Sequence, residues 1–215
     1  MLNRIADLCL FFATWVITIP VLIGSLRYRQ LSKECRIIYF FTIIAWVTEI
    51  SSYITRSMSI NNMPLLHIYT VVEFTMISWF YHVLFKKMFS FSPLIFIAVL
   101  FACGSVINSV FIQRILSFNS YTRGIEAMLI IVYAVVFLYG FFFQSDTRQV
   151  TDNPALWITA GILIYFSGAA TLFILSNYIL PMGYQFNKNV WALHAMLSII
   201  MYCFITVGLW KSKTI

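Results

Sequence analysis

Long runs of apolar residues, separated by short polar connectors, follow one another along this chain. A helix rises about 1.5 Å per residue, so about 20 apolar residues cross the roughly 30 Å hydrocarbon core of a bilayer. Pro64 and Pro154 stand where two such runs begin, a helix position that tolerates the missing backbone N–H. The pattern predicts seven membrane-spanning helices, over residues 5–26, 37–56, 64–85, 92–112, 123–144, 155–178 and 190–210.

Composition places these runs in lipid and not in a water-soluble core. Hydrophobic residues make up 61% of the 215 positions and charged residues only 10%, against roughly 25% charged in soluble domains. A bilayer accepts apolar side chains all round a helix, whereas one soluble core cannot bury so many. We therefore expect an all-α membrane protein with a single transmembrane domain over residues 1–215. The net charge of +7 arises in short connectors, so it indicates membrane topology and no nucleic-acid partner.

The distribution of Lys and Arg among the connectors predicts the direction in which the chain crosses the bilayer. With the N-terminus outside, nine of these residues lie on the inner side and five on the outer side. Cytoplasmic connectors carry the excess in membrane proteins, which predicts the N-terminus outside and the C-terminus inside. The inverted arrangement is the alternative. The inner set is Arg27, Arg29, Lys33, Arg36, Lys86, Lys87, Arg148, Lys211 and Lys213, and the outer set is Arg4, Arg56, Arg114, Arg123 and Lys188.

Two short segments suggest an internal repeat. Residues 62–67 and 189–194 both read Asn, three further residues, then Leu-His, and each opens a predicted helix. Membrane folds often contain repeated units of this kind. The interpretation is two parallel three-helix units, residues 1–87 and 123–213, joined by the helix at 92–112. The alternative is a chance similarity between apolar helices.

Two carboxylates are predicted to lie inside the bilayer. Glu49 falls in the outer half of the second helix, and Glu73 falls close to the midplane of the third. An ionisable side chain at such depth must be paired, hydrated or protonated, and it usually faces a bundle interior or a wet cavity. Arg56 and Arg123 are the candidate partners. The alternative role is structural hydrogen bonding between helices.

Other polar side chains map to the same outer half, while the inner half has few ionisable groups apart from His82. This distribution predicts a ligand-binding cavity that opens outward and is closed below by apolar packing. For the histidines and for Glu126, simple exposure near the interface is the alternative. The predicted ligand-binding residues are Glu49, Tyr53, His67, Glu73, Asn108, Glu126, His194, Ser198 and Tyr202.

No established catalytic motif accompanies these residues. The sequence lacks His-Glu-x-x-His, Gly-x-Ser-x-Gly, a phosphate-binding loop and Cys-x-x-Cys, and its last predicted helix has no lysine for a retinal Schiff base. A metal held by His67, Glu73 and His194 is stereochemically conceivable. The sequence therefore predicts no catalytic residue and specifies no cofactor.

Three segments resemble an uncharacterised group of small bacterial seven-helix membrane proteins. They are WITAGILIYFS (157–167), YTVVE (69–73) and WALH (191–194), and the resemblance extends over most of the chain. It implies an inner (plasma) membrane location and no known activity. The arrangement of three helices, a linker helix and three more also resembles small sugar facilitators, although their Pro-Gln signature is absent.

These features favour a receptor-like or sensory protein that binds a small ligand or ion in the outer cavity. The tail after the seventh helix, residues 211–215, is too short for an output domain, so we expect a protein partner to carry the signal. The other expected partner is the lipid bilayer, and an oligomer is compatible with the sequence. Alternative functions are a small-solute transporter, a metal-dependent hydrolase of lipids, or an assembly subunit whose carboxylates join helices.

Overall fold

The computed structural model describes residues 2–89, 92–144 and 151–213, and all its secondary structure is helical. Seven helical segments within these ranges are long and apolar enough to cross a membrane, as predicted. The elements are α1 (Leu2–Val16), α2 (Thr18–Leu26), α3 (Lys33–Ser57), α4 (Met63–Met88), α5 (Leu94–Ile107), α6 (Ser120–Gln144), α7 (Pro154–Ile179) and α8 (Tyr184–Lys211), with a 3₁₀ turn at Tyr28–Gln30 and a π-helical turn at Asn108–Ile112.

The first span is broken into α1 and α2 at Ile17, which the sequence analysis did not anticipate. Pro20 explains the break, because its ring clashes with the carbonyl of the residue four positions earlier and it cannot donate a backbone hydrogen bond. That earlier residue is Val16, where α1 ends. The two halves of the span therefore follow different directions.

Several helices begin earlier than their apolar segments. Helix α3 begins at Lys33 instead of residue 37, α6 at Ser120 instead of 123, and α8 at Tyr184 instead of 190. Polar residues at a membrane interface can continue the backbone hydrogen bonds of a helix. A hydrophobic pattern alone therefore does not predict where the helix begins. Arg123 is therefore not a connector residue. It lies inside α6 with its side chain 11% exposed, so it does not count toward the outer set of basic residues.

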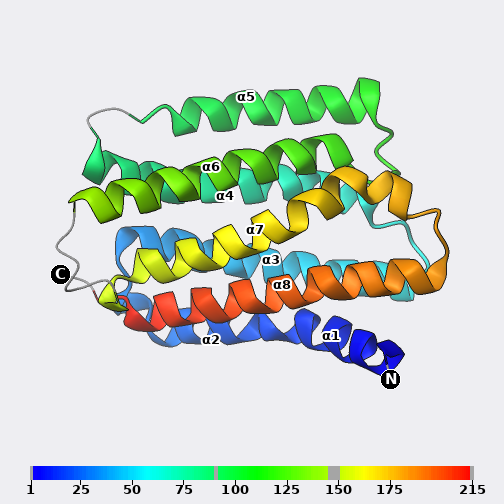
Figure 1. Cartoon of the computed structure of the whole chain (residues 1–215), viewed down its shortest axis with the longest axis horizontal. Helices are drawn as coiled ribbons and strands as arrows, with labels where there is room; N and C mark the ends of the chain where they lie inside the picture. Colours follow the sequence, from blue (N-terminus) through cyan, green and yellow to red (C-terminus); the bar gives the residue numbers. More distant parts are fainter. Residues whose placement is uncertain (1, 90–91, 145–150, 214–215) are drawn as a thin grey trace.

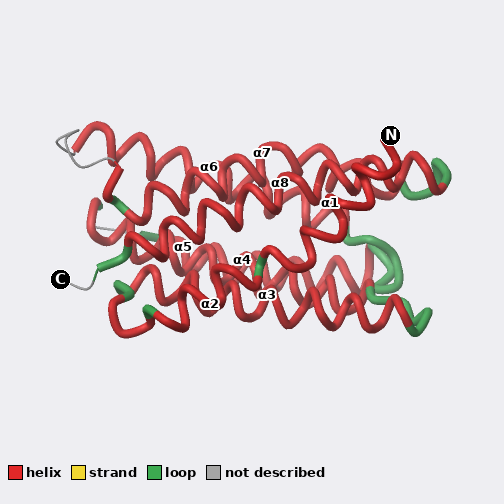
Figure 2. The backbone as a smooth tube through the Cα atoms, turned by 90° about the horizontal axis from the view of Figure 1, so that it is seen from below, coloured by secondary structure: helices red, strands yellow, loops and turns green. Residues whose placement is uncertain are grey.

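The helices form an elongated two-layer bundle (Figures 1 and 2). Helix α7 packs between α6 and α8, and α4 packs against α3, α5 and α6. The broken first span closes the ring, since α1 and α2 both pack on α8 and α2 also packs on α3. Helix α5 lies at the edge of the bundle, where α4 is its main helical neighbour. The N-terminus and the end of α8 lie at opposite ends of the bundle.

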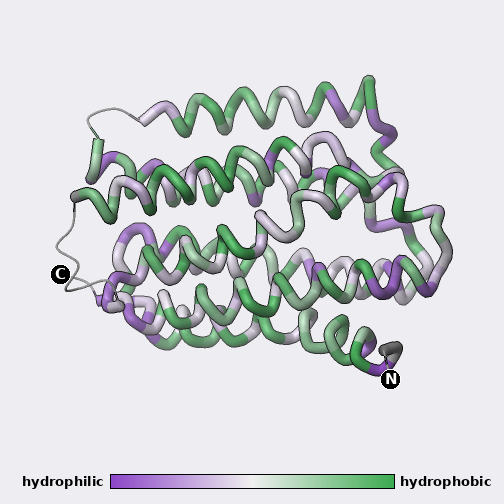
Figure 3. The backbone as a smooth tube through the Cα atoms, viewed as in Figure 1, coloured by the Kyte–Doolittle hydropathy of each residue, from purple (hydrophilic) through white to green (hydrophobic). Residues whose placement is uncertain are grey.

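Apolar side chains cover the outside of this bundle as well as its core. The largest fully buried side chains include Tyr81, Phe41 and Phe166, yet Phe96 and Phe143 are 66% and 75% exposed. Hydrophilic residues gather toward the two ends of the bundle, with hydrophobic residues along its length (Figure 3). Such a surface suits lipid and not water, so the fold indicates a multi-pass membrane protein.

Ion pairs between helices mark both ends of the bundle. At the end that contains the last turn of α8, Lys87 Nζ lies 2.9 Å from Glu34 Oε1. At the opposite end, Lys188 Nζ lies 2.6 Å from Asp7 Oδ1 and joins α8 to α1. The predicted inner-side Arg148 lies outside the described residues.

Small residues bring α7 and α8 close together. A Cβ atom on Gly161 would lie 2.6 Å from Phe204 Cβ, and one on Gly208 would lie 2.9 Å from the Pro154 carbonyl oxygen. Both distances are shorter than van der Waals contact, so the two backbones approach only because these positions lack a side chain. Gly161 and Gly208 therefore serve the close packing of these two helices.

Candidate functional site

A cavity of about 330 Å³ lies among the helices, in the half of the bundle that contains the N-terminal end of α1. Its walls come from α1, α3, α4, α6, α7, α8 and the connector that precedes α6. Sequence-distant segments therefore meet around one space. Five of the predicted ligand-binding residues line it, namely Glu49, Glu73, His194, Ser198 and Tyr202.

His67 does not line this cavity, contrary to the sequence-based expectation. Its side chain is 4% exposed, and both ring nitrogens have partners: Nδ1 lies 2.7 Å from Ser109 Oγ and Nε2 lies 3.0 Å from the Ser117 carbonyl oxygen. The ring thus joins α4 to the turn that follows α5 and to the next connector. His67 has a structural role, because no ring nitrogen remains for a ligand.

Three further predicted residues also lie outside the cavity wall. Asn108 is buried in the π-helical turn and donates a hydrogen bond to Gln113 Oε1 at 3.1 Å. Glu126 is fully buried behind Arg123. Tyr53 is 59% exposed and points outward, where it lines a separate groove between α1 and α3. On α3 the neighbouring residue Ser52 faces inward. Tyr53 is one residue further along the helix and therefore faces outward.

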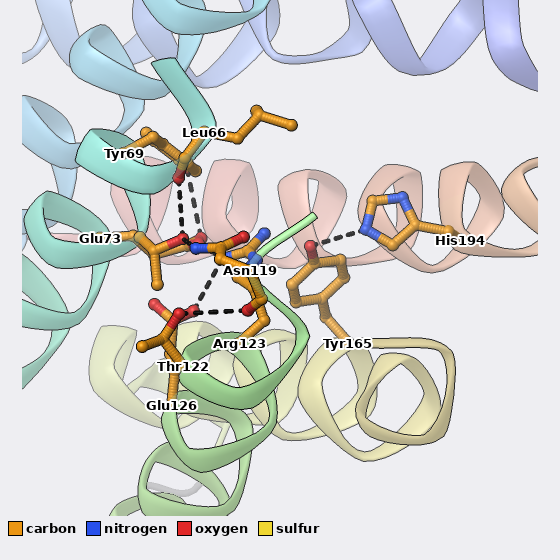
Figure 4. Close-up of polar contacts among 10 residues, drawn as sticks. Leu66, Tyr69, Glu73, Asn119, Thr122, Arg123, Glu126, Tyr165 and His194 are labelled. Atoms are coloured by element: carbon orange, nitrogen blue, oxygen red, sulfur yellow. Dashed lines mark hydrogen bonds and ion pairs between the residues drawn. The ribbon is translucent and has the colours of Figure 1, made fainter. Parts of the chain in front are cut away.

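Glu73, Arg123 and Glu126 form a buried ionic cluster beside the cavity (Figure 4). Arg123 Nη1 donates to Glu73 Oε2 and, at 2.8 Å, to Glu126 Oε2. Tyr69 OH donates to Glu73 Oε1 at 3.2 Å. The exposed fractions of the Glu73 and Glu126 side chains are 2% and 0%. The guanidinium also packs over the ring of Phe173, with Cζ 4.4 Å from the ring centroid.

This cluster contains two carboxylates and one guanidinium. An unpaired charge in a protein interior costs several kcal/mol, so one cation cannot compensate both ionised acids. Glu126 Oε1 is buried and has no hydrogen-bond partner among the described residues. A proton on one carboxylate, or a second cation nearby, is what such a cluster requires. The site can therefore take up positive charge.

Asn119, which lines the cavity, has an unpaired acceptor atom. Its Nδ2 donates to Thr70 Oγ1 at 2.8 Å, and the Thr70 hydroxyl in turn donates to the Leu66 carbonyl oxygen at 2.8 Å. Because the threonine proton is already used, the amide must present its NH₂ group to Thr70, which decides the Asn119 orientation. Its Oδ1 is then left without a partner, on a side chain that is 0% exposed and borders the cavity.

An aromatic wall holds His194 on the other side of the cavity. Tyr165 OH lies 2.9 Å from His194 Nε2, as Figure 4 shows. The rings of Tyr165, Phe173 and Trp191 each lie with centroids 5.5 Å from that of His194, and all three residues line the cavity. The imidazole is thereby oriented, and the wall offers ring faces to a ligand.

Apolar packing closes the bundle beyond the cavity. Phe41, Ile77, Tyr81, Ile162 and Ile205 come from four helices, lie in the half away from the cavity and are all 0% exposed. They belong to one continuous core. The expected apolar closure below the polar half is present.

A metal site built from His67, Glu73 and His194 is not formed. Within residues 2–89, 92–144 and 151–213, no three His, Cys, Asp or Glu side chains gather as a metal-binding group. His67 is held by Ser109 and Ser117, whereas His194 is held by Tyr165. The sequence contains the required residue types, but the fold does not bring the three side chains together.

Some cavity residues were missed by sequence reasoning. Tyr69 precedes Glu73 by four residues, a spacing that places both on one helix face and could have identified the pair. Arg123 was considered only as a partner at the rim. Asn119 and Tyr165 carry no local signal, because one lies in a connector and the other in an apolar helix.

Comparison with protein-family models, with curated proteins and with solved structures found no match to this chain.

Proposed function

We propose that this protein is a receptor-like membrane protein that binds a small ligand in the cavity and passes the signal to a protein partner. The observation that carries the proposal is a polar cavity in one half of the bundle, closed in the other half by fully buried apolar residues. A ligand shifts a conformational equilibrium only through different affinities for two states. A cavity whose walls come from six helices and a connector suits this purpose, since a ligand there contacts elements that can move relative to one another.

The proposed topology has the N-terminus outside, in the plasma membrane, so that the cavity opens outward. The excess of Lys and Arg supports it, with Arg27, Arg29, Lys33 and Arg36 in the first connector and its flank. We also infer two related three-helix units. Packing supports this inference, because α8 packs on the first span as α4 packs on α6, and α3 packs on α4 as α7 packs on α8.

Partner contact is tested by photo-crosslinking in native membranes. Benzoylphenylalanine replaces Leu26, which is 82% exposed at the end away from the cavity. In the same background, Ser198→Trp fills the cavity and Ser198→Ala is the control, since Ser198 lines the cavity wall. We expect one discrete adduct whose yield changes at least threefold with Ser198→Trp and not with Ser198→Ala. A yield that both variants leave unchanged contradicts the receptor proposal.

A transporter is the second candidate, because the break between α1 and α2 lies at Ile17, which lines the cavity. Broken helices beside a binding site are typical of transporters. A transporter must open its closed half to water. Ile205→Cys, in a variant without the four native cysteines, tests this with a membrane-impermeant thiol reagent applied from each side. We expect no labelling, and labelling would favour the transporter.

A further inference from the structure

The cavity wall has an excess of hydrogen-bond acceptors. Asn119 Oδ1 is buried and unpartnered, and its orientation is decided by the chain of hydrogen bonds through Thr70. Glu49 adds a carboxylate that is only loosely paired, with Oε1 3.8 Å from Arg56 Nη2. A buried polar atom without a partner is destabilising, so a bound group that donates N–H bonds is favoured here.

The charged side chains around the cavity also favour a bound cation. With every group ionised, the three carboxylates of Glu49, Glu73 and Glu126 exceed the two guanidiniums of Arg56 and Arg123 by one, a charge that a proton on one carboxylate or a bound cation compensates. A cation in the cavity would compensate the remaining negative charge at short range. Neutral or anionic ligands would not.

Aromatic residues border the same space. Tyr69, Tyr165 and Trp191 line the cavity together with Asn119. An ammonium group over an aromatic face is attracted by the ring, most strongly when it is desolvated. The wall thus combines carboxylates, an amide oxygen and aromatic rings, a combination that suits a primary ammonium.

A surface groove lies next to this cavity. It has a volume of about 480 Å³, lies between α1 and α3, and is lined by Phe11, Trp15 and Tyr53. It shares Leu10, Thr14 and Arg56 with the cavity wall. Helix α1 packs on α8 and α2 and has no extensive contact with α3. The groove is therefore a gap between two helices and not a closed seam.

Exposed aromatic side chains border the groove along two candidate membrane spans, and Arg56 and Ser57 border it at the end of α3. Phe11, Trp15 and Tyr53 are 60%, 53% and 59% exposed, and they belong to helices that span the membrane. An alkyl chain within it would contact apolar side chains on one side and lipid on the other. The head group of the same molecule has only to pass the residues that groove and cavity share to enter the space that Asn119 lines.

We propose that the ligand is a single-chain amphiphile with a primary ammonium head, which enters from the bilayer between α1 and α3. The head group binds Asn119 Oδ1 and the Glu49 and Glu73 carboxylates, and the tail occupies the groove. This proposal rests on the receptor-like function proposed above and specifies its ligand class. It involves binding only, with no covalent step.

Binding is measured with radiolabelled dodecylammonium and the full chain in phosphatidylcholine nanodiscs, with empty nanodiscs as the measure of partitioning. We expect saturable binding beyond partitioning. Unlabelled dodecyltrimethylammonium, which has no N–H, and ethylammonium, which has no tail, should each compete at least tenfold more weakly than dodecylammonium. Dodecanol, which has no charge, should compete as weakly.

Two pairs of variants locate the head group and the tail. Glu49→Gln should weaken dodecylammonium binding at least tenfold, whereas Asp152→Asn, at the far end with its side chain 80% exposed, should not. Leu10→Trp fills the junction between groove and cavity and should also weaken binding tenfold. Leu8→Trp is the matched control, because Leu8 is 54% exposed and borders neither space.

Each contrary result overturns the proposal. An absence of saturable binding, or binding that Glu49→Gln and Leu10→Trp leave unchanged, excludes the amphiphilic amine. Ethylammonium that competes as well as dodecylammonium excludes entry from the bilayer. Equal competition by dodecyltrimethylammonium excludes the Asn119 contact. The receptor proposal is judged separately by the crosslinking response to Ser198→Trp, which uses no amine.

Discussion

At the scale of single side chains, Arg123 links carboxylates from two helices. Glu73 comes from α4 and Glu126 from α6, one turn from the arginine itself. Removal of one member of a buried ionic cluster leaves the others uncompensated, whereas replacement of the whole cluster by neutral groups is often tolerated. The role of charge in this cluster is therefore tested by comparing a single substitution with a combination of substitutions.

Arg123→Met should destabilise the protein by about 3–5 kcal/mol, because two buried carboxylates lose their cation. Adding Glu73→Gln and Glu126→Gln should restore most of that stability, since no buried charge remains. Thermal unfolding in detergent measures both variants against the unmodified protein. A triple variant as unstable as Arg123→Met would show that the cluster acts through shape and not through charge.

His67 shows how a residue suited to binding serves structure instead. Its two hydrogen bonds join α4 to the end of α5 and to the following connector. His67→Leu should lower stability by about 1–3 kcal/mol, because the half-buried Ser117 carbonyl loses its partner. His67→Gln, which keeps a donor, should lose less. Crosslinking from position 26 should still respond to Ser198→Trp in both variants, and loss of that response would give His67 a role in the cavity.

At the scale of helices, α7 and α8 form the closest pair because of their small residues. Gly161→Ala places a Cβ atom 2.6 Å from Phe204 Cβ and 3.1 Å from the Met201 carbonyl oxygen, so one helix must move. We expect a loss of about 1–3 kcal/mol, as for other overpacked cores. Unfolding in detergent measures the change.

Gly104→Ala is the matched control for this interface, because a Cβ atom there meets nothing within 4 Å. Alanine favours a helix over glycine by up to about 1 kcal/mol, so Gly104→Ala should leave stability unchanged or raise it. Similar losses for the two substitutions would mean that helix propensity, and not the approach of α7 to α8, explains the effect.

At the scale of the whole molecule, the direction of insertion follows from charge. The proposed topology places the end of α8 on the inner side, together with Lys211 and Lys213. A green fluorescent protein fused to the C-terminus should fluoresce in bacterial cells, and alkaline phosphatase fused there should be inactive. The opposite pair of results would place the cavity on the inner face and contradict an outward-facing receptor.

The spans were predictable because each depends on local quantities alone. A run of about 20 apolar residues crosses a bilayer whatever its neighbours are, and backbone hydrogen bonding in lipid leaves only the helix for such a run. For this reason all seven predicted ranges overlap a helix of the structure. The same ranges place Glu49 and Glu73 within two spans, and both residues line one cavity of the structure.

The contacts between helices depended on packing, which no local pattern contains. His67 and His194 follow the same Asn and Leu-His pattern, yet one is enclosed by Ser109 and Ser117 and the other faces the cavity. The rotation of each helix about its axis decides which side chains point inward, and that rotation depends on packing against helices that are distant in the sequence. Asn119 is a second example. Its amide group donates to Thr70, 49 positions earlier in the sequence, and this hydrogen bond leaves the amide oxygen unpaired.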